Sequence, residues 1–403
     1  MKKNSVLAGV TIIDATLHES GPVATQMLAF LGANVIHINR PDDDASKRYL
    51  DFTIRNCNKK DITLNTKAPE GKEIMWRLIE SADAFVENFA PGAWERMGFG
   101  YEEVKARNPE IVYVTLKGFP QKTRFEKCIT YDPVACSTGG STFLSGMEED
   151  DPMLCGINIG DAGSSIVSAT VIAGALLRKK VTGKGCYMET PMQVSVMSQS
   201  RRMFWEYYAN GGKVRRAGNS YRGLEPTAPH NIYEAEGYDP TGNYVMISCS
   251  ADPESKDFEN LCKAIGREDL LADPRYATPA LRYENRQALD FEINKWTRHR
   301  RRAEIMRRLA LEYKVPCAPV NGIDDVYNDP FLRGGTSIFR EMVDPGIPKT
   351  GMAWAPTLPV HMSNGDITPV SCGVNGQANE EIYCGMLGFT KDELAELKAK
   401  NVI

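Results

Sequence analysis

The sequence lacks the patterns by which several common classes of protein are recognised. Its 403 residues contain no GxGxxG, no GxxxxGK[ST] and no GxSxG, so the usual support for dinucleotide binding, P-loop chemistry and a hydrolase nucleophile elbow is missing. The five histidines show no metal-ligand spacing, and no metal site is predicted. The ten cysteines are scattered singly without a CxxC, which in so long a chain indicates reduced core thiols rather than disulfides.

Long hydrophobic runs and an excess of positive charge are also absent. The longest apolar stretch, SIVSATVIAGALL, is interrupted by Ser, Thr and Gly and falls short of the roughly 18 residues that span a bilayer. The N-terminus lacks the long apolar region and cleavage site of a secretory signal. A net charge of −4 argues against wholesale binding to nucleic acid or anionic membranes. We therefore expect a cytoplasmic protein with neither a nucleic acid nor a membrane as partner.

The first third of the chain alternates strand patterns with helix patterns. Buried-strand patterns occur at 8–14, 34–41, 83–89 and 110–119. Amphipathic helix patterns at 21–33, 69–82 and 101–109 separate them. This order predicts a mainly parallel sheet covered by helices, an α/β fold.

Later segments indicate a second unit. Residues 186–212 have the pattern of a strand leading into a long helix, and 213–229 is rich in Gly, Pro and charge, as linkers are. Two strand-like halves flank a turn-rich middle in 230–250, and 315–322 is again strand-like. The tail, 388–403, has the pattern of a short amphipathic helix.

Asp161 is the most conspicuous chemical group in the sequence. It lies in NIGDAGSS, among small residues, immediately before the apolar run. An aspartate at this place is typical of a helix N-cap, whose replacement by alanine costs about 0.5–2 kcal/mol. On its own the pattern does not separate that structural role from a chemical one.

Several separated stretches resemble the class III CoA transferases, the family of formyl-CoA transferase and carnitine CoA-transferase. They include HESGPVATQMLAFLGANVIHINRP, VENFAPGAWERMGF, GDAGSSIVSATVIAGALLRKKVTGKG and YKVPCAPVNGIDDVYNDPFLR, in the family's order. The resemblance covers nearly the whole chain. It implies a large Rossmann-like domain made from 1–212 with 331–403, a linker at 213–229, and a smaller α/β domain at 230–330. It also implies that two subunits interlock into a homodimer.

The resemblance implies specific roles for residues of the site. The aspartate of the family's Gly-Asp pair, here Asp161, is the nucleophile. Coenzyme A, which enters as an acyl-CoA substrate and without a metal, is contacted by residues that match His18, Glu19, Ser20, Arg40, Asn88, Phe89, Arg96 and Met97, and Tyr131 matches a tyrosine near the acyl group. Arg40 follows a predicted strand, at the edge where open α/β sheets bind ligands.

The implied activity is transfer of CoA from an acyl-CoA donor to a free carboxylic acid. Asp161 would form a mixed anhydride and then an aspartyl-CoA thioester, and the helix N-terminus would stabilise the anions beside it. Four small neighbours, Gly160, Ala162, Gly163 and Ser164, are expected to leave room for a bulky thioester to reach the carboxylate.

Two departures from the family pattern bear on the acids used. Formyl-CoA transferase has a glutamine where this chain has Glu19, and it carries a glycine run in its small domain that NSYRGLEPTAPHNIYEAEG does not contain. Two carboxylates in one pocket oppose each other's ionisation. The sequence leaves open whether the acids are of the formate and oxalate type or larger.

Two other functions stay open at the level of sequence. A 2-methylacyl-CoA racemase has the same fold, but its motif has a histidine before an aspartate where this chain has Tyr131 and Asp132, and tyrosine is the poorer base at neutral pH. The other is a non-catalytic acyl-CoA-binding subunit. The Gly160-Asp161 pair argues against it, because a binding protein needs no nucleophile.

Overall fold

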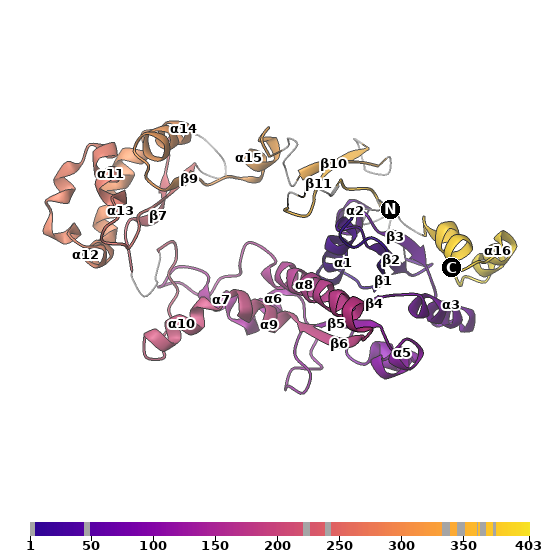
Figure 1. Cartoon of the computed structure of the whole chain (residues 1–403). Coiled ribbons are helices and arrows are strands. Elements are labelled where there is room, and N and C mark those ends of the chain that lie inside the picture. The colour runs from indigo at the N-terminus through magenta and orange to yellow at the C-terminus, as the bar shows by residue number, and fades with distance from the viewer. Residues whose placement is uncertain are drawn as a thin grey trace. The chain divides into compact units, whose positions relative to one another are not determined.

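The computed structural model describes residues 5–43, 49–220, 226–237, 243–332, 339–344, 351–360, 362, 368–373 and 376–403. The chain divides into two units (Figure 1). Unit 1 comprises Met1–Ser141, Leu154–Ser200 and Pro330–Ile403, and unit 2 comprises Thr142–Met153 and Arg201–Asp329. The predicted linker, 213–229, falls within the span of unit 2, and its residues 221–225 lie outside the described residues.

Unit 1 is built on a six-stranded sheet in which every neighbouring pair is parallel. Its order is β3-β2-β1-β4-β5-β6, formed by β1 (Thr11–Ala15), β2 (Asn34–Asn39), β3 (Lys60–Thr63), β4 (Ala84–Glu87), β5 (Val112–Lys117) and β6 (Cys186–Pro191). The predicted parallel sheet is confirmed. The strand order reverses between β1 and β4, the arrangement of doubly wound nucleotide-binding folds.

Alternate residues of each strand feed two separate cores. On one face Ile12, Val35 and Val114 pack against α1 (Ser20–Phe30) and α8 (Ile159–Thr182). On the other face Ile13, Ile36 and Phe85 pack with α3 (Pro69–Glu80) and the C-terminal elements. Because the side-chain period of a strand is two, one apolar run serves both faces.

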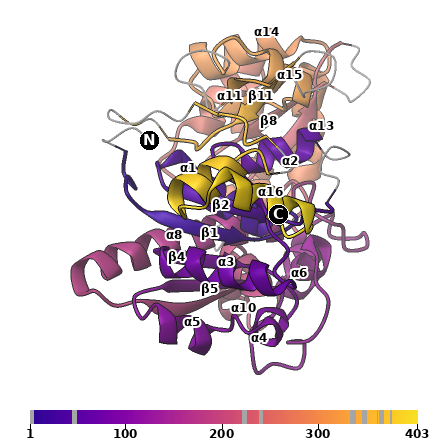
Figure 2. The ribbon, with the colours of Figure 1, turned by 90° about the vertical axis from the view of Figure 1, so that its right-hand side faces the viewer.

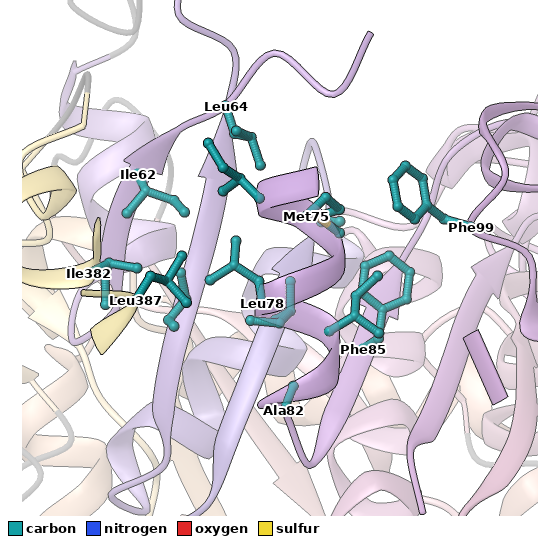
Figure 3. Close-up of a cluster of buried hydrophobic side chains, with 14 of the residues drawn as sticks. Ile62, Leu64, Met75, Leu78, Ala82, Phe85, Phe99, Ile382 and Leu387 are labelled. Atoms are coloured by element: carbon teal, nitrogen blue, oxygen red, sulfur yellow. The ribbon is translucent and has the colours of Figure 1, made fainter. Parts of the chain in front are cut away.

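The second core joins segments from opposite ends of the chain. Ile382 and Leu387 lie beside Ile62 and Leu78 of the N-terminal part (Figure 3). Figure 2 views unit 1 from the side on which α3, α5 (Tyr101–Arg107) and α16 (Lys391–Ala399) lie. The predicted tail helix is α16, and a capping box between Thr390 and Glu393 starts it.

Helix α8 is long and apolar enough to cross a membrane by length and composition, with a mean hydropathy of 1.4 over its best window. Half of that window is buried inside the protein. The buried side chains, among them Ile172 and Leu176, pack against the sheet. A core helix of a globular domain passes the same test, so the property does not by itself indicate a membrane span.

Shorter elements complete unit 1. They are α2 (Tyr49–Asn56), α4 (Ala93–Met97), α6 (Asp132–Gly139), α9 (Met192–Gln199), the helical turn Glu380–Met386, and the antiparallel pair β10 (Phe339–Val343) and β11 (Met352–Pro356).

Unit 2 contains a three-stranded antiparallel sheet with helices packed on it. Its strands are β7 (His230–Glu234), β8 (Tyr244–Ser248) and β9 (Cys317–Pro319), at the positions where strand patterns occur in the sequence. The helices are α7 (Ser141–Leu144, shared at its first residue with unit 1), α10 (Arg202–Ala209), α11 (Asp257–Ile265), α12 (Pro279–Glu284), α13 (Arg286–Thr297), α14 (Arg302–Met306) and α15 (Ile323–Asn328).

The single long helix expected after β6 is wrong. The chain forms α9 and then α10, with Ser200 and Arg201 between them, and the division between the two units falls at that break. Residues 198–202, Ser-Gln-Ser-Arg-Arg, are all polar, so the apolar pattern is interrupted at the break. All ten cysteines are free, and five of them, Cys57, Cys136, Cys249, Cys262 and Cys372, are buried as the core-thiol interpretation expects. Four others are partly exposed and Cys128 is exposed, so the interpretation holds for half of them.

Candidate active site

A cavity of about 320 Å³ opens in unit 1 at the carboxyl ends of the parallel strands. Its walls come from the turn after β1, the loop after β4, the end of β5, the segment 126–131, Asp161 and Met192. The strands β1 and β4 are neighbours at the point where the strand order reverses. Loops leave such a point in opposite directions, which opens the crevice where doubly wound sheets bind ligands.

Six of the ten predicted site residues line this cavity: His18, Ser20, Asn88, Phe89, Tyr131 and Asp161. They come from four separate segments of the sequence. The fold therefore brings together residues that the sequence presents up to about 140 positions apart.

Asp161 is the third residue of α8, and it is not the helix cap. Asn158 occupies the N-cap position without a side-chain capping bond. The capping role falls to Asp132 on α6, whose Oδ1 accepts hydrogen bonds from the backbone N–H groups of Gly160 (2.7 Å) and Asp161 (3.1 Å). The N-cap interpretation of Asp161 is wrong, and its side chain is left to the cavity.

The small residues around Asp161 serve packing. A Cβ added to Gly160 would lie 2.8 Å from Asp132 Oδ1, and one added to Gly163 would lie 1.5 Å from Gln199 Nε2 on α9. Ser164 is fully buried. Close neighbours account for the absence of a side chain at Gly160 and Gly163, and the access of a thioester past the small residues stays a prediction. Ala162 alone is exposed.

The surroundings of Asp161 favour its neutral form. Burial, followed by the negative charges of Glu19 and Asp132, raises the pKa of Asp161 to about 6, against lowering by Arg55 and by a hydrogen bond from the Ser20 backbone. Asn158 Nδ2 donates to Glu19 Oε2 (3.2 Å), which holds this second carboxylate beside the first turn of α8. A carboxylate with a pKa close to neutrality, in a cavity, is a typical active-site group.

The turn from β1 to α1 is fixed by its neighbours. The side-chain amide of Asn88 accepts from the Leu17 N–H (2.8 Å) and donates to the Leu17 carbonyl (2.7 Å). His18 adopts a φ of 67°, in the left-handed region that few residues other than glycine enter. Arg55 donates to the His18 carbonyl, and Ser165 on α8 donates to the Ser20 carbonyl (2.8 Å).

A buried ion pair supports the opposite wall. Lys117 Nζ, at the end of β5, lies 2.7 Å from Glu87 Oε1 and donates to the Phe89 carbonyl at 2.6 Å. Glu87 Oε2 accepts from the Phe89 N–H (2.8 Å). Burial raises the pKa of Glu87, against the lowering effect of Lys117. The pair fixes the backbone of the loop that carries Asn88 and Phe89.

Sequence reasoning missed several lining residues, including Lys117, Met192 and the segment 126–130. Lys117 ends a strand that the sequence does predict, so the strand-end rule applied to Arg40 would have found it. Met192 follows β6 and carried no such signal, because a methionine after a strand is usually core.

Tyr131 lies at the mouth of the cavity. Its ring packs edge-to-face against the His18 ring, with 6.0 Å between the centroids, and 59% of the residue is exposed. It is therefore not a core tyrosine.

Four predicted contacts lie outside the cavity lining. Glu19 acts on Asp161 through its charge, as described above. Arg40 is paired with Asp42 and 74% of its side chain is exposed. Arg96 is exposed and reaches the Pro91 carbonyl (3.4 Å). Met97 packs on the core that α3 forms. Arg40 directly follows β2 and so lies at the carboxyl edge of the sheet, whereas Arg96 lies on α4, nine residues after the end of β4.

Within the described part of the chain, no three His, Cys, Asp or Glu side chains are grouped so as to hold a metal ion. The cavity offers the carboxylate of Asp161, whose pKa is raised, and the side chains of His18, Lys117 and Lys127.

A comparison with protein families matches residues 7–370 to the model of CoA-transferase family III. The chain belongs to CoA-transferase family III. The predicted family and enzyme class are thus confirmed.

Relatives of this family resemble the chain along its length. The formyl-CoA:oxalate CoA-transferase of Streptomyces coelicolor is 33% identical over 98% of this chain and 99% of its own. The protein of the same name from Rhodopseudomonas palustris is 32% identical over 97% of this chain and 95% of its own.

Two solved structures have the same fold as this chain. A CaiB/BaiF family protein from Brucella suis is 26% identical, with a TM-score of 0.79 over 99% of this chain and 100% of its own. Rv3272 from Mycobacterium tuberculosis gives a TM-score of 0.76 at 22% identity, over 92% of this chain and 97% of its own, a likeness of fold alone.

Proposed function

We propose that this CoA-transferase moves CoA from an acyl-CoA donor to a free carboxylic acid, with Asp161 as the nucleophile. The observation that carries the proposal is the place of Asp161. It lines the cavity at the strand-order reversal, while Asp132 takes over the capping of its helix. The other carboxylate in the lining, Glu126, accepts a hydrogen bond from the Lys122 N–H (2.9 Å).

The reaction proceeds through Asp161 in four acyl transfers. The carboxylate attacks the donor thioester, which gives a mixed anhydride and the CoA thiolate. The thiolate attacks the aspartyl carbonyl, which gives an aspartyl-CoA thioester and releases the donor acid. The acceptor carboxylate attacks that thioester to form a second anhydride, and the thiolate then attacks the acceptor carbonyl. Asp161 is regenerated as a carboxylate, and no water or ATP is consumed.

The protein supports the anions that form in these steps. Asp161 lies in the first turn of a 24-residue helix, whose N-terminal partial positive charge favours anions. The Ser20 backbone hydrogen bond lowers the pKa of Asp161 against the effect of burial, so it favours the nucleophilic form. CoA is proposed to contact His18, Ser20, Asn88, Phe89 and Tyr131 in the cavity, and Arg40, Arg96, Met97 and Glu19 beside it.

The donor and acceptor acids are proposed from the names of the relatives and from the negative charge of Glu19. The names of the relatives make formyl-CoA and oxalate the first donor and acceptor to test. Glu19 adds a negative charge close to Asp161, and like charges repel strongly in a partly buried site. An acceptor with a single carboxylate is therefore favoured over a dianion such as oxalate.

The nucleophile is tested by trapping. Protein is incubated with acyl-CoA and hydroxylamine, and the modified carboxylate is mapped by mass spectrometry. The expected result is modification of Asp161 in the parent, none at that position in D161N, and loss of CoA transfer in D161N. Glu126→Gln is the matched control and should behave as the parent. Labelling of another carboxylate, or full turnover in D161N, would overturn the assignment.

An interlocked homodimer and a cytoplasmic location are also part of the proposal. Ile166, Leu177 and Val181 on α8 each leave more than half of the residue exposed, and apolar residues on one helix support a subunit interface. Light scattering of the purified chain is expected to give twice the mass of one chain, and a monomer at micromolar concentration would contradict the dimer.

A further inference from the structure

A charged pair is buried behind the turn that joins β1 to α1. Asp14 on β1 and Lys59 before β3 both have side chains with no solvent exposure, and Lys59 Nζ is 2.7 Å from Asp14 Oδ2. Thr25 Oγ1 donates to Asp14 Oδ2 (2.7 Å), and the Thr16 N–H donates to Oδ1 (3.1 Å). Although burial opposes it, the charges of Lys59 and His37 hold the pKa of Asp14 below its usual range. The carboxylate is thus ionised.

Lys59 is bonded in three directions. Its ammonium group donates to Asp14 Oδ2, to the Pro22 carbonyl and to Asn56 Oδ1, each at 2.7 Å. Pro22 lies in the first turn of α1, and Asn56 ends α2. One buried side chain therefore connects β1, α1 and α2.

The connected elements surround one turn of the candidate active site. Asp14 is bonded to Thr16, where the turn begins, and Lys59 is bonded to Pro22, just after it ends. Between these points lie His18 and Ser20, which line the cavity. The pair therefore clamps both ends of the turn, whereas Asn88 holds only its middle.

Stability alone does not account for a pair of this kind. Removing two charges from water is costly, and apolar residues of similar size in place of a buried ion pair are often as stable or more stable. The bonds of Lys59 have fixed directions, whereas apolar contacts have none. A directional network can therefore select one backbone conformation, here one with φ of 67° at His18, that apolar packing would not specify.

We propose that Asp14 and Lys59 are positioning residues of the CoA-transfer reaction, which hold Thr16–Ser20 in the conformation that presents His18 and Ser20 to the cavity of Asp161. The inference rests on the proposed function of that cavity. Neither residue touches substrate. Their effect passes through the backbone of the turn.

The test replaces the pair by apolar residues, as D14L/K59M. Three quantities are measured: the unfolding temperature, the hydrogen exchange of the Leu17–Ser20 amides in the unliganded protein, and the kinetics of CoA transfer. We expect a lower unfolding temperature, because the Thr16 N–H and the Pro22 carbonyl lose their buried partners. At a temperature where both proteins are fully folded, exchange of these amides should be about tenfold faster, and kcat/KM should be lower by about tenfold, mainly through a higher KM for acyl-CoA. E259L/K263M, which removes a surface ion pair of unit 2, should change none of these.

The outcomes are separable. Parental exchange and parental kcat/KM in D14L/K59M would overturn the inference, because the pair would then be structural only. If D14L/K59M does not fold, Thr25→Val removes one hydrogen bond to Asp14 at nearly constant volume, and about two- to threefold changes of the same sign are expected. Full activity in D161N would overturn the proposed function, whereas the exchange measurement compares the parent with D14L/K59M, both of which retain Asp161.

Discussion

The carboxylate of Asp132 accepts hydrogen bonds from the backbone N–H groups of two successive residues, Gly160 at 2.7 Å and Asp161 at 3.1 Å. The first N–H groups of a helix have no acceptor within the helix. The Asp132 side chain supplies the acceptor for two of them in α8. The same negative charge contributes, after burial and Glu19, to raising the pKa of Asp161. A single residue of α6 thus caps the helix in place of the proposed nucleophile and contributes to raising the pKa of that nucleophile.

The capping role of Asp132 predicts different effects for two substitutions. Asp132→Ala leaves both N–H groups without their acceptor and should lower the free energy of unfolding by about 0.5–2 kcal/mol. Asp132→Asn keeps a side-chain oxygen at the same place and should cost less than about half of that. Urea denaturation followed by circular dichroism measures both. Equal losses in the two variants would mean that the charge, and not the hydrogen bonds, stabilises the helix.

The raised pKa of Asp161 predicts the acid limb of the pH profile. Because the nucleophile must be ionised, kcat/KM for CoA transfer should fall as the pH drops through about 6. Glu19→Gln removes the larger of the two neighbouring charges that raise this pKa, and its amide oxygen still accepts from Asn158. The limb should therefore move to lower pH.

Glu126→Gln provides the control for that experiment. Glu126 lines the same cavity, but it is not among the principal causes of the shift at Asp161. Its profile should coincide with the parent's. If the acid limb of the pH profile moved equally in Glu19→Gln and Glu126→Gln, the limb would depend on the net charge of the cavity and not on Glu19.

The same pKa predicts that the proposed nucleophile costs stability. A carboxyl whose pKa is raised on folding is favourable only below its unfolded pKa, near 4, and the penalty is complete above the folded value of about 6. Asp161→Asn removes the penalty. After allowance for partial exposure, it should raise the free energy of unfolding at pH 7.5 by about 1–2 kcal/mol.

The sign of that effect is checked by its pH dependence. The increase in the free energy of unfolding caused by D161N should become smaller as the pH falls from 6 to 4. Urea titrations at fixed ionic strength measure it. A gain that is constant over this range would point to packing or helix propensity instead of ionisation.

The double hydrogen bond between Asn88 and Leu17 predicts graded effects. Asn88→Ala removes both bonds from a half-buried site and should cost about 1 kcal/mol, with a higher KM for acyl-CoA because the turn loses its central support. Asn88→Asp retains an acceptor for the Leu17 N–H but no donor for the Leu17 carbonyl. Its stability and its KM for acyl-CoA should lie between those of the parent and those of Asn88→Ala. An unchanged KM in Asn88→Ala would show that the turn is held by its ends alone.

Much of the architecture follows from local pattern. The strands β1, β2, β4 and β5 are marked by apolar runs, and the helices between them by a period near 3.6, so the parallel sheet is determined by hydrophobic periodicity. The strand β3 is short and polar in sequence, KDIT, and is a strand because its neighbour β2 and the C-terminal core bury it. The family was determined by sequence as well, because its motifs are separate and occur in order.

The roles of individual residues at the site were decided by the tertiary structure. Sequence placed Asp161 at the start of a helix, but only the packing of α6 against α8 brings Asp132 to the cap and leaves the side chain of the proposed nucleophile free of that role. Likewise Gly163 is small because α9 approaches it, and Lys59 acquires its place because β1, α1 and α2 meet there. Each of these contacts joins segments far apart in the chain, and hydrogen bonds and excluded volume between such segments leave no periodic trace in the sequence.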